Sequence, residues 1–391
     1  MELQIGGVSA VFLAKEFGTP LYVYDKQIIL QRIHDLKENL LQAHICYAIK
    51  ANQNLSILKL IAQQGLGVDC SNRIELELAE KAGFDLKKSV FTSTNPSDED
   101  LKKALDSGVL MNIDHLSIFK RLQKIGLPKR ISFRINPGFG NGKFPEIDVG
   151  GKGSKFGMSQ ELAIECYKLA KESGIEQFGI HMMTGSCILD ENYFEKLILT
   201  IEKIAENIEK VVGINFEWID IGGGLGVPYE PFEKPLNLKS FGEKIARVKK
   251  SSATLVIEPG RFIVAQSGTL LTTVTTRKET FVGVDAGMTT LIRPMLYGAY
   301  HPIVLANDIS APETEIYTVV GPICESTDCF AKDRALPMIK EGDILAIQIT
   351  GAYGFTMSSQ YNGQPRPAEI LIENGAYSVI RKKETTEDLL S

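Results

Sequence analysis

The chain of 391 residues is poor in the residues that build metal or disulfide frameworks. It has six cysteines and only five histidines, and no two cysteines form a Cys-x-x-Cys pair. The cysteines are Cys46, Cys70, Cys166, Cys187, Cys324 and Cys329. Disulfide frameworks and structural zinc sites need clustered ligands, so we expect neither, and we expect no other metal site. Most of these thiols are expected to be buried as small apolar side chains.

The sequence also lacks an excess of positive charge and any long apolar run. It has 43 Lys and Arg against 48 Asp and Glu, a net charge of −5, so no positive field is available to hold nucleic acid or an anionic membrane. No stretch approaches the roughly 18 apolar residues that span a bilayer. Residues 1–5 do not begin a secretion signal. We therefore expect a cytoplasmic protein that binds neither nucleic acid nor membranes.

Up to about residue 258 the sequence is rich in short β-branched runs that alternate with helical patterns. This alternation predicts strands at 45–49, 67–69, 90–92, 110–113, 131–135, 178–181, 216–220 and 255–257. It predicts helices at 26–40, 56–64, 73–82, 98–107, 115–125, 159–173, 192–210 and 240–250. Ser97 and Asp100 have the spacing of a capping box. The pattern favours an α/β fold with a TIM-type (β/α)8 barrel, with an open doubly wound sheet as the alternative.

The pattern changes after Arg261, where β-rich runs are separated by Gly, Pro and Asp. Strands are predicted at 281–284, 316–320, 344–349 and 369–372. These runs indicate a second domain, an antiparallel β-barrel or sandwich. We expect residues 26–265 to form the (β/α)8 barrel, and residues 266–391 to form the second domain together with residues 1–25.

The predicted barrel strands end in polar residues that suit chemistry. They are Lys50, Asp69, His181, Asp220 and Glu258, and the active sites of such barrels lie at the carboxyl ends of the strands. A lysine at the end of an apolar strand is explained either by an ion pair or by a functional amine, for example one that forms a Schiff base.

A glycine run follows the seventh predicted strand. Gly222-Gly223-Gly224 is explained either as a flexible turn or as a set of backbone N–H groups that cradle a phosphate, with Arg261 as a second phosphate ligand. Glu258 either pairs with Arg261 or keeps a pyridine nitrogen protonated. A lysine for an aldehyde, a phosphate cradle and a carboxylate for a ring nitrogen together point to pyridoxal 5'-phosphate.

Several motifs extend this interpretation along most of the chain. They are Tyr47-Ala48-Ile49-Lys50-Ala51-Asn52, Ile221-Gly222-Gly223-Gly224, Glu258-Pro259-Gly260-Arg261, Gly321-Pro322-Ile323-Cys324-Glu325-Ser326-Thr327-Asp328, Gly351-Ala352-Tyr353-Gly354 and Met357-Ser358-Ser359-Gln360-Tyr361-Asn362. In order, they resemble the motifs of the fold type III pyridoxal-phosphate decarboxylases, which share the alanine-racemase-like barrel.

A further set of motifs resembles one branch of that family, the diaminopimelate decarboxylases. They are Asp285-Ala286-Gly287, Ile292-Arg293-Pro294 and Leu296-Tyr297-Gly298-Ala299-Tyr300-His301. This resemblance implies decarboxylation of meso-2,6-diaminopimelate to L-lysine and CO2, the last step of lysine biosynthesis.

The resemblance also implies roles for individual residues. Lys50 would carry the cofactor as a Schiff base, Gly223, Gly224 and Arg261 would lie near its phosphate, and Glu258 would face its pyridine nitrogen. Arg293 and Tyr297 would hold the distal carboxylate of the substrate, and Arg261 and Tyr353 would contact both cofactor and substrate. The family forms homodimers with shared active sites, so Cys324 of the partner subunit would donate a proton and Glu325 of the partner subunit would bind the distal amino group.

Alternatives remain for the single residues and for the whole chain. Cys324 alone suits a packed thiol, Arg293 suits a surface ion pair, and Tyr297 and Tyr353 suit core aromatics. Met183 stands where the family has a histidine that stacks on the cofactor, and Thr289-Thr290 replaces an Asn-Asp pair. These departures suit a decarboxylase of a related amino acid in specialised metabolism. A racemase and a non-catalytic relative are the other candidates.

Overall fold

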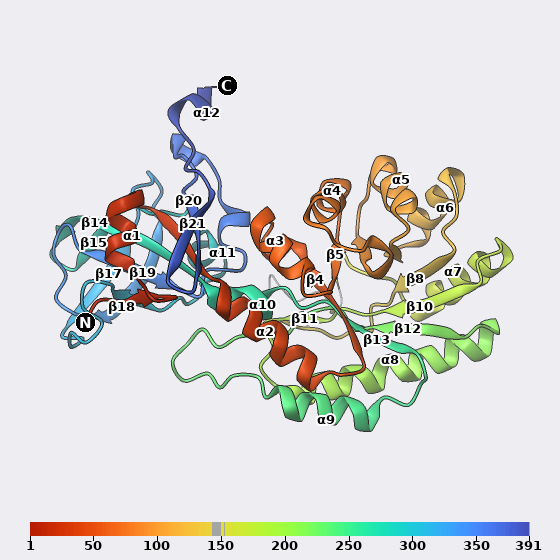
Figure 1. The fold of residues 1–391 in the computed structure, drawn as a ribbon. Helices are drawn as coiled ribbons and strands as arrows, with labels where there is room; N and C mark the ends of the chain where they lie inside the picture. The colour runs from red at the N-terminus through yellow and green to blue at the C-terminus, as the bar shows by residue number, and fades with distance from the viewer. Residues whose placement is uncertain (143–149, 152, 391) are drawn as a thin grey trace. The chain divides into compact units, whose positions relative to one another are not determined.

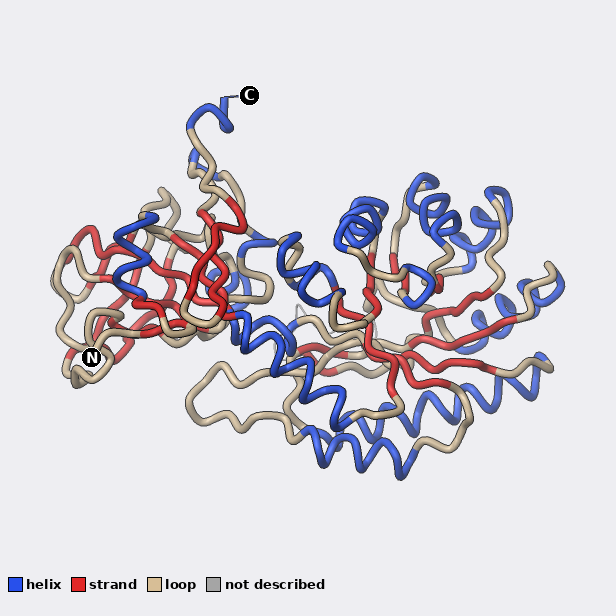
Figure 2. The backbone as a smooth tube through the Cα atoms, viewed as in Figure 1, coloured by secondary structure: helices blue, strands red, loops and turns tan. Residues whose placement is uncertain are grey.

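The computed structural model describes residues 1–142, 150–151 and 153–390, and the chain divides into two compact units. The barrel unit comprises residues 33–227 and 234–262. The sheet unit comprises residues 1–32, 228–233 and 263–391. Figure 1 traces the chain through both units, and Figure 2 marks its helices and strands.

The barrel unit is built on a closed barrel of parallel strands. Within the described residues eight strands form it: β4 (Ala43–Ala48), β5 (Gly67–Cys70), β6 (Val90–Ser93), β7 (Leu110–Ile113), β8 (Arg130–Arg134), β10 (Gln177–His181), β12 (Phe216–Asp220) and β13 (Thr254–Ile257). Each strand pairs with the next in this order, and β13 pairs with β4 to close the barrel. All eight predicted strands are present, so the barrel is confirmed and the open sheet is wrong.

One helix precedes the barrel strands and the others alternate with them, and from the second helix to the last each contacts its neighbour along the chain. They are α2 (Lys26–Asn39), α3 (Leu55–Ala62), α4 (Arg73–Ala82), α5 (Asp98–Ser107), α6 (Leu116–Ile125), α7 (Gln160–Glu172), α8 (Glu191–Val212) and α9 (Leu238–Val248). A short pair of strands, β9 (Asn141–Gly142) and β11 (Gly185–Ser186), lies outside the barrel sheet. Every predicted helix is confirmed.

Local sequence explains where the helices begin, end and pack. Ser97 and Asp100 form the predicted capping box at the start of α5, with both reciprocal hydrogen bonds present. Helix α8 starts after the cap Asp190 and ends at Gly213, which has a φ of 69°, a conformation that glycine adopts without strain. Its apolar side chains recur on one face, where residues such as Ile201 are fully buried.

The sheet unit contains a nine-stranded sheet that gathers segments from both ends of the chain. Its strands are β3 (Leu21–Asp25), β14 (Gly268–Lys278), β15 (Phe281–Val284), β16 (Ile303–Leu305), β17 (Glu315–Val320), β18 (Cys329–Leu336), β19 (Ile344–Gln348), β20 (Ala368–Glu373) and β21 (Ala376–Arg381). Its smaller elements are β1 (Gln4–Ile5), β2 (Val8–Ser9), α1 (Ala10–Phe17), α10 (Arg261–Val264), α11 (Arg293–Tyr297) and α12 (Thr386–Leu390), of which α10 starts in the barrel unit. The four strands predicted after Arg261 are present.

The pairing in this sheet corrects one expectation. Strand β3 lies between β14 and β20, antiparallel to the first and parallel to the second. Strands β15 and β17 are also parallel. The second, β-rich domain is therefore confirmed, but its sheet is mixed and not wholly antiparallel, because connections long enough to reverse the chain precede β17 and β20.

Candidate active site

Polar side chains gather at the carboxyl end of the barrel strands. Lys50 lies in the 3-10 turn η1 (Ile49–Ala51) directly after β4, Asp69 lies in β5, and His181 and Asp220 are the last residues of β10 and β12. Glu258 follows β13. Because the eight strands are parallel, their carboxyl ends meet on one rim, where barrel enzymes place their chemistry.

Lys50 forms an ion pair on this rim. Its Nζ lies 2.6 Å from Oδ2 of Asp69. The Asp69 side chain is fully buried, whereas the Lys50 side chain is 46% exposed. The lysine is therefore less buried than a residue inside an apolar strand. The ion-pair explanation is confirmed, and the functional explanation stays a prediction. Burial and the nearby Glu258 raise the pKa of Asp69 to about 7, although the Lys50 charge opposes the shift.

Glu258 is the centre of a second buried group. Nε2 of His181 lies 3.6 Å from Oε2 of Glu258, and both side chains are almost completely buried. Asp220 completes the group, with ligand atoms of all three residues within 4.8 Å of one another. Such a spacing also suits a metal ion, so the expectation of no metal site stays a prediction.

The pKa values of the neighbouring carboxyl groups of Asp220 and Glu258 shift in opposite directions. Burial and the charge of Glu258 raise the pKa of Asp220 well above its ordinary value. Burial alone also raises the pKa of Glu258, but the approach of His181, the Lys50 charge and a hydrogen bond with Asp220 bring it down to about 2. Burial lowers the pKa of His181. The proton therefore stays on Asp220 and the negative charge stays on Glu258.

The glycine run forms a tight turn between β12 and the rim. Gly222 and Gly224 have φ values of 66° and 96°, and a Cβ on Gly223 would lie 2.4 Å from the backbone oxygen of Glu258. The N–H of Gly223 donates to Sδ of Met183 at 3.1 Å. Only residues without a side chain fit this backbone. The N–H of Gly222 also has an acceptor, Oδ1 of Asp220 at 2.8 Å, so the role of this turn as a phosphate cradle stays a prediction.

Arg261 reaches the same place from the opposite direction. Its Nη2 donates to Oγ of Ser186 at 3.4 Å, and a Cβ on Gly224 would lie 2.9 Å from the backbone oxygen of Gly185. Gly224 and Arg261 therefore both contact the short strand β11. The sequence missed Ser186 as a site residue, although it follows His181 in a Gly-Ser turn that marks the end of a strand.

These residues fit a pyridoxal phosphate group. Oε1 of Glu258 is buried without a hydrogen-bond partner among the described residues, and a buried carboxylate oxygen of this kind needs a donor such as a protonated ring nitrogen. Arg261 supplies N–H donors for a phosphate, and a phosphate oxygen would replace Sδ of Met183 as the acceptor of the Gly223 N–H. Lys50 supplies a primary amine.

The remaining predicted residues belong to the sheet unit. Arg293 begins α11 and is buried, and Tyr297 ends the same helix and is half-buried. Tyr353 has a left-handed φ of 56°. Arg293 and Tyr297 therefore lie four residues apart on one short helix, and their binding of one carboxylate stays a prediction.

Cys324 and Glu325 lie on an exposed turn of the sheet unit. The buried Asp328 fastens this turn, because its carboxylate accepts from the backbone N–H groups of Ile323 and Met288. Cys324 is thus not a packed thiol. Four of the six cysteines are buried, as the sequence predicted.

The Thr289-Thr290 pair is explained by contacts inside the sheet unit. Oγ1 of Thr290 donates to the backbone oxygen of Gly287, and Tyr22 donates to the backbone oxygen of Thr290 at 2.6 Å. Both threonines are buried. Their role here is to hold the segment before Arg293.

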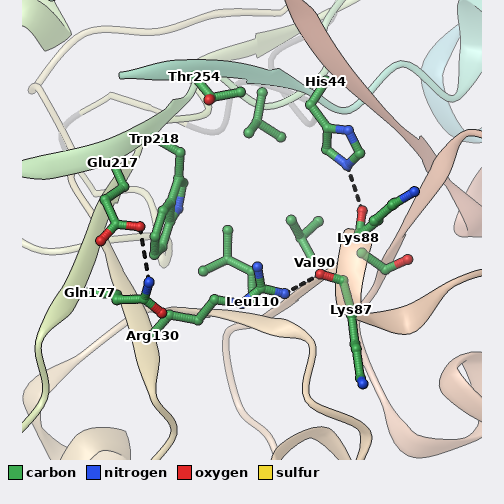
Figure 3. A pocket seen from close by; sticks show the side chains of 12 residues that line it. His44, Lys87, Lys88, Val90, Leu110, Arg130, Gln177, Glu217, Trp218 and Thr254 are labelled. Atoms are coloured by element: carbon green, nitrogen blue, oxygen red, sulfur yellow. Dashed lines mark hydrogen bonds between the residues drawn. The ribbon is translucent and has the colours of Figure 1, made fainter. Parts of the chain in front are cut away.

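A cavity of about 230 Å³ opens at the other end of the barrel. Its lining includes His44, Val90, Leu110, Arg130 and Thr254, which stand at the beginnings of their strands (Figure 3). Lys87 and Lys88 contribute backbone oxygens that accept from Arg130 and His44. This amino-terminal cavity faces away from the rim of Lys50 and Glu258, so we do not assign it to the candidate site.

Comparison with known proteins places these features in a family context. Residues 26–265 match the family model described as pyridoxal-dependent decarboxylase, pyridoxal binding domain. The diaminopimelate decarboxylase of Methanothermobacter thermautotrophicus is 44% identical and the alignment covers 99% of this chain and 94% of that protein. The enzyme of the same name from Archaeoglobus fulgidus is 39% identical, with coverages of 99% and 96%.

Solved structures agree with the sequence comparison. The diaminopimelate decarboxylase of Helicobacter pylori complexed with L-lysine is 38% identical, with a TM-score of 0.91 and coverage of 97% of each chain. The diaminopimelate decarboxylase of M. jannaschii in co-complex with L-lysine is 32% identical, with a TM-score of 0.92 and coverage of 100% of this chain and 95% of that chain. Within the described residues of our chain, no helix has the length and apolar character to cross a membrane.

Proposed function

Since this chain belongs to the diaminopimelate decarboxylase family of pyridoxal-dependent decarboxylases, we propose that it converts meso-2,6-diaminopimelate to L-lysine and CO2. One observation carries the choice of substrate. The guanidinium of Arg293 is buried, and its partners among the described residues, His301 and Tyr229, carry no carboxylate. A buried cation without a counter-charge is costly, and a ligand carboxylate would offset that cost. Diaminopimelate supplies one at the end that does not react.

Pyridoxal 5'-phosphate would be held by Lys50, Gly223, Gly224, Glu258, Arg261 and Tyr353. The bound cofactor accepts the electron pair that remains when CO2 leaves. Glu258 keeps its negative charge because Asp220 holds the shared proton, so Glu258 can hold a ring nitrogen in its protonated form. Asp69 accepts a hydrogen bond from Nζ of Lys50 at 2.6 Å, which orients the amine that would react with the aldehyde.

The proposal includes a homodimer in which each site receives residues from both subunits. Arg293 and Tyr297 would bind the distal carboxylate, and Arg261 would contact the substrate as well as the phosphate. Cys324 of the partner subunit would protonate the substrate carbon after CO2 leaves, and Glu325 of the partner subunit would accept hydrogen bonds from the distal amino group. The exposed position of these two residues on a fastened turn supports this role, because an exposed turn can enter a neighbouring subunit.

We further propose residues 26–265 as the cofactor-binding domain and residues 1–25 with 266–391 as the second domain. The cytoplasmic location stays a prediction.

The deciding experiment is incubation of the purified protein, loaded with pyridoxal phosphate, with meso-diaminopimelate while lysine and CO2 are followed together. Equal amounts of the two products support the proposal, and Lys50→Ala is the control that should yield neither. A loaded protein that retains a borohydride-sensitive absorbance but forms no lysine would contradict the substrate and point to another amino acid. A change of configuration without CO2 would point to a racemase.

A further inference from the structure

The guanidinium of Arg293 is held by aromatic and neutral groups. The residue is 2% exposed, and its centre lies 4.7 Å from the ring centroid of Tyr229. Its hydrogen bond in the described part of the chain joins Nη1 to Nε2 of His301 at 3.0 Å. The rings of Tyr229 and His301 also contact each other, at 5.3 Å between centroids and in an edge-to-face arrangement.

The hydrogen bonds of the two ring nitrogens of His301 determine which nitrogen carries the proton. Nδ1 lies 2.9 Å from the backbone oxygen of Gln348, and a carbonyl oxygen can only accept, so Nδ1 carries the hydrogen. Nε2 faces Nη1 of Arg293, and a guanidinium can only donate, so Nε2 carries a lone pair. His301 is therefore a neutral imidazole that donates to β19 and accepts from Arg293.

A neutral acceptor has a different effect from a carboxylate at this position. Asp or Glu would orient the guanidinium equally well, but would also neutralise it and compete with an incoming carboxylate. His301 occupies one N–H of Arg293 and leaves the full positive charge and the other N–H groups for a ligand. The face of Tyr229 restricts the tilt of the guanidinium plane.

We propose that His301 is a positioning residue for substrate recognition, which holds Arg293 in one orientation without cancelling its charge. This inference rests on the proposed function, in which Arg293 binds the distal carboxylate. His301 acts through Arg293 and touches neither the reacting carbon nor the departing carboxyl group.

The test compares two substitutions that separate the two nitrogens of His301. His301→Asn keeps a donor close to the position of Nδ1 but removes the acceptor at Nε2, whereas His301→Gln places a carbonyl oxygen close to the position of Nε2. The probes are L-lysine, which retains the distal carboxylate, and cadaverine, which is the same diamine without it. Binding of each to the loaded enzyme is measured by calorimetry.

We expect His301→Asn to weaken lysine binding by about tenfold and to leave cadaverine binding unchanged. His301→Gln should restore most of the lost affinity for lysine. In steady-state kinetics, the KM for diaminopimelate should rise in His301→Asn while kcat changes little. Equal affinities in the Asn and Gln variants, or an equal loss for lysine and cadaverine, would overturn the proposal and make His301 a packing residue.

Two further measurements keep the outcomes separable. If Arg293→Ala retains the preference of the enzyme for lysine over cadaverine, the proposed role of Arg293 fails, and the role of His301 fails with it. If Arg293→Ala abolishes the preference but His301→Asn does not, only the role of His301 fails. Should the His301 variants not fold, the 15N shifts of the histidine rings in the unmodified enzyme decide. A proton on Nδ1 with an unprotonated Nε2 supports the proposal, and a proton on Nε2 contradicts it.

Discussion

Lys50, in the turn that follows β4, lies 2.6 Å from the carboxylate of Asp69 in the neighbouring parallel strand β5. One partner is half-exposed and the other is fully buried. The amine is thus accessible to a ligand, while the carboxyl group beneath it is held in surroundings that favour its neutral form.

This arrangement predicts a pH dependence of stability in the protein prepared without cofactor. The pKa of Asp69 is about 7 in the folded chain, against an ordinary value of 3.8. Between pH 3.8 and about pH 7 the folded chain therefore keeps a proton on Asp69 that the unfolded chain has lost. The stability that this proton contributes is fully present at low pH and is lost as the pH rises through about 7. Relative to Asp69→Asn, the wild type should lose up to about 1.4 kcal/mol per pH unit between about pH 5 and about pH 7.

Chemical denaturation of both proteins at a series of pH values measures this difference. A constant difference across the whole range would show that Asp69 has an ordinary pKa.

Replacing Lys50 by arginine should separate its charge from its chemistry. Lys50→Arg keeps a cation beside Asp69, but a guanidinium does not form the covalent bond that an amine forms with an aldehyde. We expect activity to fall by roughly 10³-fold or more, with no pyridoxyl group on residue 50 after borohydride treatment and peptide mass spectrometry. Lys88→Arg is the matched control, because the Lys88 side chain is 68% exposed. This variant should keep both the activity and the pyridoxyl label on Lys50. Labelling of a different lysine in the wild type would refute the assignment.

The glycine turn gives a steric prediction. In Gly223→Ala the new Cβ would overlap the backbone oxygen of Glu258 at 2.4 Å, so the turn or Glu258 has to move. A shift of this kind costs about 1–3 kcal/mol, and we expect both a lower melting temperature and at least a tenfold weaker affinity for pyridoxal phosphate by fluorescence titration. Gly283→Ala, whose nearest neighbours lie at 3.5 Å, should change neither. Undiminished cofactor affinity in Gly223→Ala would exclude this turn from the phosphate site.

The shared active site predicts complementation between inactive subunits. Lys50→Ala and Cys324→Ala should each be inactive as homodimers. Random exchange of their subunits should restore roughly a quarter of the wild-type activity, because half of the dimers are then mixed and each mixed dimer has one intact site. Lys50→Ala mixed with Glu258→Ala should restore nothing, since both residues come from the same barrel. No recovery in the first mixture would mean that Cys324 serves its own subunit.

The local sequence predicted most of the barrel because its signals are local. Buried strands such as β7 are short apolar runs, and the helices between them carry their own caps, as Ser97 and Gly213 do. The polar residues on the rim were predictable for the same reason, since each one lies at the carboxyl end of a recognisable strand or just after it.

Contacts between distant segments were not predictable in this way. The parallel pairing of β3 with β20 depends on segments that are more than 340 residues apart, and no local pattern specifies it. Tyr229 lies on an irregular segment and contacts Arg293 and His301 only in the folded chain. His301 stood in a motif noted from the sequence, but its role depends on a backbone oxygen of β19, which the sequence alone does not place.

The position of β3 also has a consequence for the order in which the protein is made. Residues 21–25 leave the ribosome before the barrel strands, yet both of their neighbours in the sheet, β14 and β20, come from after residue 267. The strands of the barrel are complete before either neighbour exists. During synthesis β3 therefore has neither of its sheet neighbours while the barrel strands are made, and its pairing is complete only after β20 has been made.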